Sequence, residues 1–192
     1  LTKDEMTVRK VFVAGELLEV SGAGYEPIGR MLLDGREIGS TDKPVLGECL
    51  LAGALCNDAQ LAERDGRWDV AGDPTEGALL VAAKKAGIDL AQAVNDHPRI
   101  DAIPFASERQ YMATLHRAGS GGPGTLYLKG AVEKVARLCE RDLADDGTER
   151  PFDPQSVLDQ VEVFAGRGLR VLAFARKTLP TATATLDEKD VE

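Results

Sequence analysis

Three strand-like runs follow one another in the middle of the chain with only short connections between them. They are residues 99–106, 111–117 and 125–129, and each contains apolar side chains typical of strands. Parallel strands need a crossover of a dozen or more residues, whereas antiparallel strands can be joined by a short turn. The runs therefore predict an antiparallel sheet at the centre of the fold.

The connection between the second and third runs contains the glycine-rich stretch Gly119 to Gly124. A phosphate-binding P-loop requires a Lys followed by Ser or Thr after its glycines, and then a helix. Neither follows here, so we predict a hairpin loop.

Helix signals flank this predicted sheet. Asp73 fits an N-cap, Pro74 the first helical position and Glu76 the third residue beyond the cap, which together form a capping box. These signals predict a helix through Ala86, closed by Gly87. Apolar side chains at helical spacing predict further helices, over residues 44–57, 131–140 and 154–165.

The remaining segments are less regular. Residues 8–21 alternate around Gly15 and predict two short strands or a hairpin, whereas residues 26–43 are either a surface loop or a small ribbon. Asp65-Gly66 predicts a turn before a short strand that contains Trp68. A last strand is predicted over 169–176, followed by a Thr-rich and then acidic linker over 178–192.

Helices and strands do not alternate regularly along the chain, which argues against a parallel α/β sheet. The predicted fold class is α+β, with a mainly antiparallel β-sheet flanked by helices. The length of 192 residues fits one compact domain or a close pair of small ones.

The charge balance restricts the class of partner. With 32 acidic and 23 basic residues the net charge is −9, which argues against a general surface for nucleic acid or anionic membrane. No run is long enough to span a membrane, so we expect a soluble chain. The three cysteines, Cys49, Cys56 and Cys139, form no C-x-x-C pair, which argues against a disulfide framework or a zinc site.

No catalytic constellation of a self-contained enzyme is present. The sequence has no G-x-S-x-G and no H-E-x-x-H, and His97 and His116 have no Cys or carboxylate at metal-ligand spacing.

Several residues admit both a structural and a ligand-binding interpretation. In the strand ending at Lys129 this lysine shares a face with Tyr127, away from the core face, and an anion between it and the next helix N-terminus would be favourable. Phe105 is either a core residue or a stacking platform. Arg170 and Leu172 share one face of the predicted last strand, a pairing that suits a nucleotide.

Taken together and in this order, the motifs resemble the nucleotide-binding domain of a type II P-type ATPase, the family of the calcium and sodium/potassium pumps. The opening Leu1 to Thr7 is similar to the tail of the family's phosphorylation motif D-K-T-G-T-L-T. Five successive blocks resemble the family's motifs, namely Cys56-Asn57-Asp58, Gly72-Asp73-Pro74-Thr75-Glu76, Pro104-Phe105 with Ser107-Glu108-Arg109, Lys129-Gly130-Ala131 and Gly168-Leu169-Arg170-Val171-Leu172-Ala173.

This resemblance implies an ATP site. Phe105 would stack on the adenine, Glu76 would hydrogen-bond the adenine amino group, and Lys129 with Gly130 would lie at the mouth of the pocket. Arg170 would complete the site on the phosphate side and Leu172 on the ring side. Gln110 stands where many members have a lysine and Ser107 where muscle-type calcium pumps have an arginine, for which Arg109 would compensate.

The resemblance also implies a mechanism of delivery. The domain would hold ATP by its base and present the γ-phosphate to an aspartate outside this chain, so no residue here would be catalytic and none would bind a metal. Magnesium would enter as Mg-ATP and be held by the phosphorylation domain of the parent pump.

The implied organisation is a nucleotide-binding domain over residues 1–177, with hinge or linker segments at 1–7 and 178–192. Since the chain opens on Leu1 rather than Met, we expect an excised, monomeric, cytoplasmic fragment of an integral membrane protein. Its partners would be ATP or ADP and the phosphorylation and actuator domains. Two alternatives are a non-enzymatic interaction domain and a stand-alone phosphotransferase.

Overall fold

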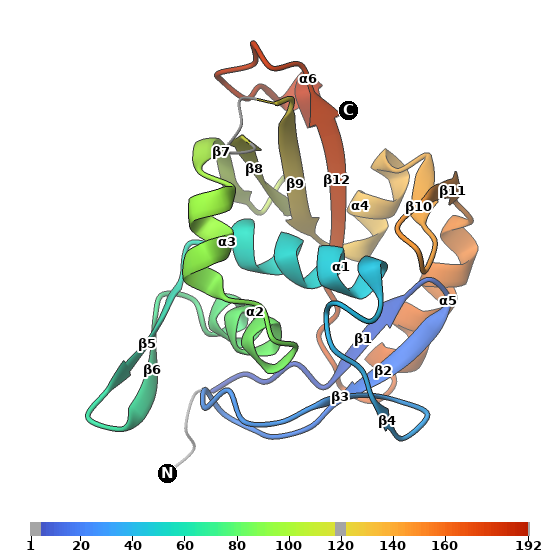
Figure 1. Ribbon diagram of the computed structural model, residues 1–192. Helices are drawn as coiled ribbons and strands as arrows, with labels where there is room; N and C mark the ends of the chain where they lie inside the picture. The colour runs from blue at the N-terminus through green and yellow to red at the C-terminus, as the bar shows by residue number, and fades with distance from the viewer. Residues whose placement is uncertain (1–4, 118–121, 192) are drawn as a thin grey trace. The chain divides into compact units, whose positions relative to one another are not determined.

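The computed structural model describes residues 5–117 and 122–191, which divide into two compact units (Figure 1). The first unit comprises the chain up to Ala93 together with Leu143–Thr148. The second comprises Val94–Asp142 and the chain from Glu149 onward. Of the two arrangements that the length allowed, the structure shows a pair of small units.

The first unit contains a four-stranded antiparallel sheet in the order β1-β2-β3-β4. At its first turn Ala14 and Gly15 both have positive φ, 51° and 84°, as in the primed turns that match the twist of a hairpin. The predicted hairpin is confirmed, and the segment after it is a small ribbon rather than a surface loop. The strands are β1 (Lys10–Val13), β2 (Glu16–Val20), β3 (Met31–Leu33) and β4 (Arg36–Glu37).

Two helices pack with this sheet, α1 (Pro44–Leu55) and α2 (Pro74–Lys85). The Asp73 carboxylate accepts the N–H groups of Thr75 and Glu76 at 2.7 and 3.2 Å, so the predicted N-cap of α2 is confirmed. The apolar centre of the unit joins the sheet to both helices and includes Leu18, Met31, Leu46, Leu50, Leu80 and Ala83.

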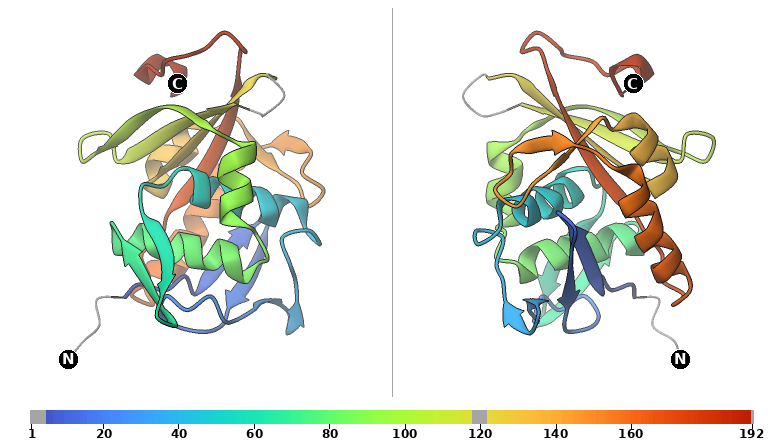
Figure 2. Two further views of the ribbon diagram at one scale, coloured as in Figure 1. Left: turned by 60° about the vertical axis from the view of Figure 1, so that its left-hand side comes forward. Right: turned by 90° about the vertical axis from the view of Figure 1, so that its right-hand side faces the viewer.

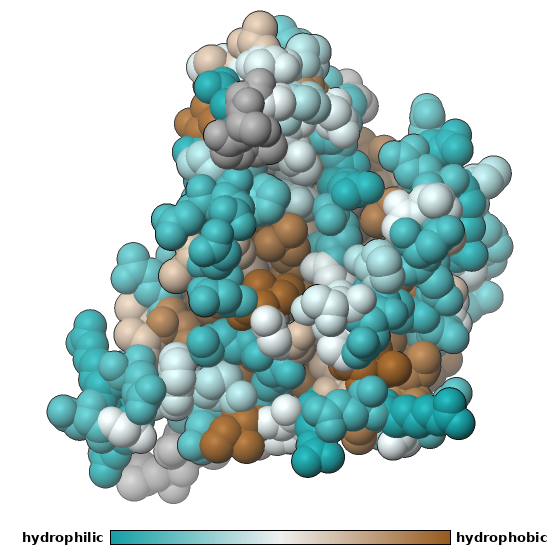
Figure 3. All heavy atoms as spheres, in the orientation of Figure 1, coloured by the Kyte–Doolittle hydropathy of each residue, from teal (hydrophilic) through white to brown (hydrophobic). Residues whose placement is uncertain are grey.

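The strands β5 (Gln60–Arg64) and β6 (Arg67–Ala71) form a separate hairpin. The predicted Asp65-Gly66 turn is confirmed, but β5 was not predicted because its residues are mostly exposed and show no apolar alternation. Figure 3 shows hydrophilic side chains covering this hairpin at the lower left. The ammonium group of Lys84, on α2, lies 5.3 Å from the centroid of the Trp68 ring, within cation–π range.

Lys43 holds the Leu143–Thr148 segment within the first unit. Its buried ammonium group pairs with Glu16 and, at 2.7 Å, with Asp145. Burial by itself lowers the pKa of Lys43, but the hydrogen bonds and charges of Asp145 and Glu16 outweigh it and leave the pKa raised. The lysine is therefore charged at neutral pH.

The second unit is built on an antiparallel sheet in the order β12-β9-β8-β7. The strands are β7 (Arg99–Ala106), β8 (Tyr111–Arg117), β9 (Gly124–Gly130) and β12 (Ala173–Leu179). The predicted central sheet is thus confirmed. The predicted hairpin loop between β8 and β9 lies partly outside the described residues, at 119–121.

Two helices, α4 (Val132–Leu138) and α5 (Pro154–Ala165), lie between β9 and β12 in the sequence. α5 has the predicted bounds, and α4 lies within its predicted range. The unit's apolar centre includes Ile103, Leu115, Leu126, Leu128, Val135 and Val191. Three features were not predicted, namely α3 (Leu90–Asp96), the β10 (Arg141–Leu143) and β11 (Glu149–Pro151) hairpin, and α6 (Glu188–Val191).

The predicted last strand began too early. Gly168 has a φ of 69° and the Leu169 N–H donates to the Phe164 carbonyl at 3.1 Å, which closes the C-terminal turn of α5. β12 starts only at Ala173, so the prediction that Arg170 and Leu172 share a strand face is wrong. The linker prediction is also wrong in part, because β12 continues to Leu179 and α6 folds farther on.

Candidate functional site

Seven of the eight predicted site residues lie in the second unit and gather at one end of its sheet. Neighbouring strands of an antiparallel sheet run in opposite directions, so the C-terminal ends of β7 and β9 lie beside the N-terminal ends of β8 and β12, at the same end of the sheet. The register shows this directly, because Gly130 pairs with Tyr111 on one side and with Ala173 on the other. The residues at this end are Phe105, Arg109, Gln110, Lys129, Gly130, Arg170 and Leu172.

Phe105 is exposed at this end of the sheet, with 60% of its surface accessible. The pairing of β7 with β8 shifts register between Ile103 and Ala106, and such a bulge redirects the side chains within it. The interpretation of Phe105 as a core residue is therefore wrong. An exposed aromatic ring is the arrangement that a stacking platform requires.

Gln110 closes the turn between β7 and β8 in a left-handed conformation, with a φ of 60°. Its N–H donates to the Ala106 carbonyl at 2.7 Å, and its own carbonyl accepts the N–H of Ala131 at 2.9 Å. Since a non-glycine residue in this conformation is uncommon, the turn is held by these bonds against a local conformational cost.

Gly130 is required by close packing rather than by its own φ. A Cβ at this position would lie 2.4 Å from the Gln110 carbonyl oxygen and 2.7 Å from the Tyr111 Cβ. The turn that carries Gln110 and the end of β9 are thus in direct contact, which no larger residue at Gly130 would allow.

Lys129 is buried, with 7% of its surface exposed. The sheet register places Lys129 opposite Met112 on β8 and Phe174 on β12. Leu126 and Leu128 belong to the apolar centre of the unit and Lys129 does not, which agrees with the predicted face assignment. The prediction did not include the burial of Lys129, which arises because both faces of β9 are buried in the structure.

Arg109 lies along β7 instead of extending into solvent. Its Nη2 donates to the Pro104 carbonyl at 2.8 Å and its Nη1 pairs with Glu188 at 3.0 Å. Sequence reasoning missed Glu188, since it lies 79 residues from Arg109 in a segment predicted to be a linker.

Glu76 lies in the first unit, in the first turn of α2. Its carboxylate accepts the N–H of Asp58 at 3.0 Å, and its backbone carbonyl accepts the side-chain amide of Asn57 at 2.9 Å. The Asn57 Oδ1 accepts the N–H of Ala59 at 2.9 Å. The motifs Cys56-Asn57-Asp58 and Asp73-Pro74-Thr75-Glu76 are therefore one hydrogen-bonded group, and Asn57 orients Glu76 although sequence reasoning gave it no role.

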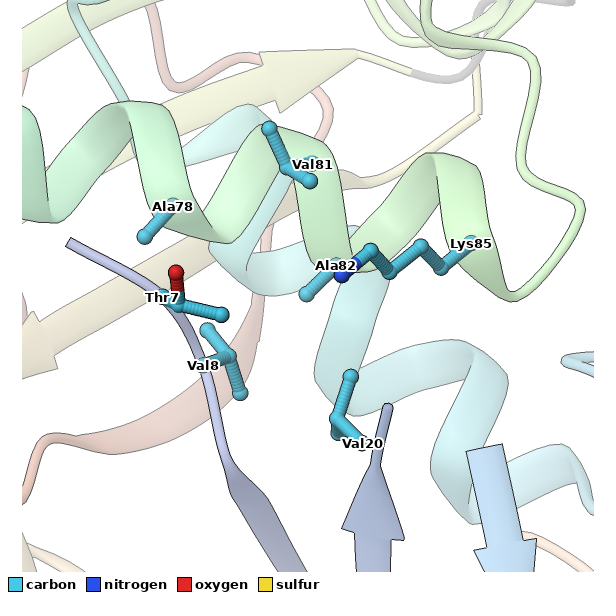
Figure 4. A pocket seen from close by; sticks show the side chains of 7 residues that line it. All are labelled: Thr7, Val8, Val20, Ala78, Val81, Ala82 and Lys85. Carbon is cyan, nitrogen blue, oxygen red and sulfur yellow. The ribbon is translucent and has the colours of Figure 1, made fainter. Parts of the chain in front are cut away.

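A small depression in the first unit contains none of the predicted site residues (Figure 4). Its empty space is about 150 Å³, open solvent included, and is below the 300 Å³ or more typical of ligand pockets. The Lys85 Nζ donates to the Ser21 carbonyl at 2.8 Å, and burial and then the charge of Arg9 lower the pKa of Lys85. The depression is lined by Thr7, Val8, Val20, Ala78, Val81, Ala82 and Lys85.

Neither a metal cluster nor a membrane span is found in the part of the chain that the structure describes. Across residues 5–117 and 122–191, no three His, Cys, Asp or Glu side chains are grouped to hold a metal ion. Within the same ranges no helix has the length and apolar character to cross a bilayer.

The chain is similar to the N domain family of P-type ATPases and to several cation-transporting ATPases. The family described as "P-type ATPase, cytoplasmic domain N" matches residues 46–192. The chain is 46% identical to the cation-transporting ATPase pma1 of Synechocystis over all of its own length and 21% of that protein. It is 43% identical to the probable cation-transporting ATPase F of Mycobacterium tuberculosis, over 90% of this chain and 19% of that one.

A further relative is the calcium-transporting ATPase of Bacillus subtilis, 33% identical over 100% of this chain and 22% of the relative. The chain spans about a fifth of the length of these relatives.

Proposed function

The chain belongs to the family of cytoplasmic N domains of type II P-type ATPases, and from this membership we propose that it is the ATP-binding domain of a cation-transporting pump. The observation that carries the proposal is the exposed Phe105 ring at the end of the sheet where six further site residues gather. Phe105 stacks on the adenine.

The other residues that we propose for the site provide either a charged contact to the phosphates or a contact to the base. Arg170 provides positive charge toward the phosphates and Leu172 an apolar contact toward the base, both from the segment before β12. Lys129 adds a positive charge at the end of β9, where Gly130 lets the neighbouring turn approach closely. By the family resemblance, Glu76 is the partner that we propose for the adenine amino group.

We propose that phosphoryl transfer takes place on another domain of the parent pump. In the parent pump this domain delivers the γ-phosphate of Mg-ATP to an aspartate outside the chain, on a phosphorylation domain. Magnesium bound with ATP would supply charge neutralisation for the phosphates in this transfer, and we propose no residue of this chain as its ligand. The isolated chain therefore binds nucleotide and does not hydrolyse it.

An ATP titration of the isolated chain, followed by the backbone amide shifts in NMR, tests this proposal. We expect saturable shifts at millimolar ATP, with or without magnesium, that are largest at Ala106, Gln110 and Gly130. A millimolar dissociation constant corresponds to about 4 kcal/mol of binding free energy. A folded chain without saturable shifts up to tens of millimolar ATP would contradict the proposal.

A further inference from the structure

Two polar contacts hold the segment that contains Leu186 and α6, one against β7 and one against the turn that follows β7. The Leu186 N–H donates to the Asp101 carboxylate at 2.8 Å, and Glu188 pairs with Arg109 at 3.0 Å. Leu186 and Val191 also pack with the apolar centre of the second unit. Figure 2 shows this last part of the chain, in red, beside the strands of that unit.

β7 is the last strand of its sheet, and among the described residues no further strand pairs with its outer side. Asp101 and Pro104 both belong to this strand, and a proline is tolerated at an edge because it cannot donate to a ladder. The N–H groups of Leu186 and Ala102 lower the pKa of Asp101, which keeps this anchor charged. Arg109 thus donates to the Pro104 carbonyl of this edge strand, and the Leu186 N–H donates to its Asp101 carboxylate.

Two nitrogens of the Arg109 guanidinium already have partners within the chain. Nη2 donates to the Pro104 carbonyl, Nη1 pairs with Glu188, and Nε is buried without a hydrogen-bond partner among the described residues. The side chain retains only 28% exposure. A phosphate ligand would need these donors directed outward, so the geometry favours a bracing function.

The peptide that Arg109 braces is the one immediately before Phe105. Phe105 is mostly exposed, so side-chain packing contributes little to its placement and the backbone must hold it. The Arg109 bond to the Pro104 carbonyl fixes the plane of that peptide, and Glu188 holds the guanidinium in place for it.

We propose that Arg109 is a positioning residue for Phe105 and that Glu188, through Arg109, makes adenine affinity depend on the docking of the 186–191 segment. This inference rests on the proposed function, because it assigns Phe105 the adenine contact. It assigns Arg109 to the support of the Phe105 backbone rather than to compensation for the arginine that Ser107 replaces.

The test compares ATP and adenosine binding in Glu188→Ala, Arg109→Ala and Arg109→Lys. We expect each variant to weaken both ligands by the same factor, about threefold to tenfold, the effect of losing one hydrogen bond. Lysine keeps the charge but cannot bridge two acceptors with a planar fork, so Arg109→Lys should not restore adenosine binding. Glu162→Ala, an exposed site on α5 with the same charge change, should leave both affinities unchanged.

Two results would overturn the inference. One is an Arg109→Ala variant that loses ATP affinity but keeps adenosine affinity, which would make Arg109 a phosphate ligand. The other is a Glu188→Ala variant that binds ATP more tightly, which would make Glu188 a competitor of phosphate.

Ligand-free spectra separate this inference from the proposed function. Glu188→Ala should shift the amide resonances of Phe105 and Ala106 without any nucleotide, whereas Glu162→Ala should not. If the wild-type chain fails to bind ATP but these shifts occur, the proposed function fails and the effect of Glu188 on the placement of Phe105 stands. If the Phe105 and Ala106 resonances do not move, Glu188 has no effect on the placement of Phe105.

Discussion

The side-chain amide of Asn57 donates to the backbone carbonyl of Glu76 at 2.9 Å. The same nitrogen donates to the Gly53 carbonyl at 3.0 Å, so one asparagine joins the last turn of α1 to the first turn of α2. Asn57 is buried, with 7% of its surface exposed. Because buried carbonyl groups that lose a donor are costly, this contact should stabilise the unit as well as orient Glu76.

Replacing Asn57 with alanine should lower the free energy of unfolding by about 1 to 3 kcal/mol, since buried polar groups lose their partners. Urea unfolding followed by circular dichroism measures the change. Asn95→Ala, on an exposed position of α3, is the matched control and should change stability little. Equal effects of the two substitutions would show that the Asn57 contacts contribute nothing.

Replacing Phe105 with alanine should separate binding from stability. If the ring stacks on adenine, its loss should cost about 1 to 3 kcal/mol of binding free energy. Because Phe105 is exposed, thermal unfolding should shift little, unlike the loss of about 3 to 5 kcal/mol expected for a core phenylalanine. A variant that melts far earlier yet binds ATP normally when folded would exclude the stacking role.

Substitution of Gly130 by alanine should destabilise the second unit. The added Cβ would meet the Gln110 carbonyl oxygen at 2.4 Å, and overpacking of this kind costs about 1 to 3 kcal/mol. Gly166 follows α5 with a helical φ of −61° and only ordinary contacts for a Cβ, so Gly166→Ala should be neutral or stabilising. Chemical denaturation of both variants tests the contrast, and a fully stable Gly130→Ala variant would contradict it.

The contribution of Lys43 should depend on pH. Its folded-state pKa is raised above the ordinary 10.5, so its ion pairs stabilise the fold fully below that pH and lose their effect as pH rises through the folded-state value. Lys43→Met should cost about 1 to 3 kcal/mol at pH 8 and progressively less above pH 10.5. Urea unfolding across this range measures the difference.

Lys177→Met, at an exposed position of β12, provides the control for Lys43→Met. Its effect should be small at pH 8. A Lys43→Met cost that stays constant from pH 8 to above pH 10.5 would show that side-chain packing, rather than charge, accounts for the role of Lys43.

Local signals in the sequence determined much of the secondary structure. The start of α2 at Pro74 and both bounds of α5 were predicted because proline, the N-cap side chains and apolar spacing act within one or two turns. The antiparallel order of β7, β8 and β9 followed from the short connections between them. The β10–β11 hairpin escaped prediction because its short strands carry almost no apolar pattern.

Strand alternation does not predict burial that depends on distant segments. Lys129 was predicted to point away from the core face, but residues on both faces of β9 are buried and Lys129 is only 7% exposed. Residues 169–172 carry a strand-like pattern, yet the turn that ends α5 takes Leu169 out of the ladder. In both cases the local pattern is correct for an isolated strand, and the surroundings decide the outcome.

Periodicity, caps and motifs along the chain were enough to predict the fold class, the central sheet and the residue types at the candidate site. They did not predict that Phe105 is exposed or that Arg109 lies between Pro104 and Glu188, which the folded structure shows. These features depend on residues that are far apart in the sequence. The partner of Arg109 comes from 79 residues away, and no local propensity encodes a contact that forms only when the chain has folded back onto an edge strand.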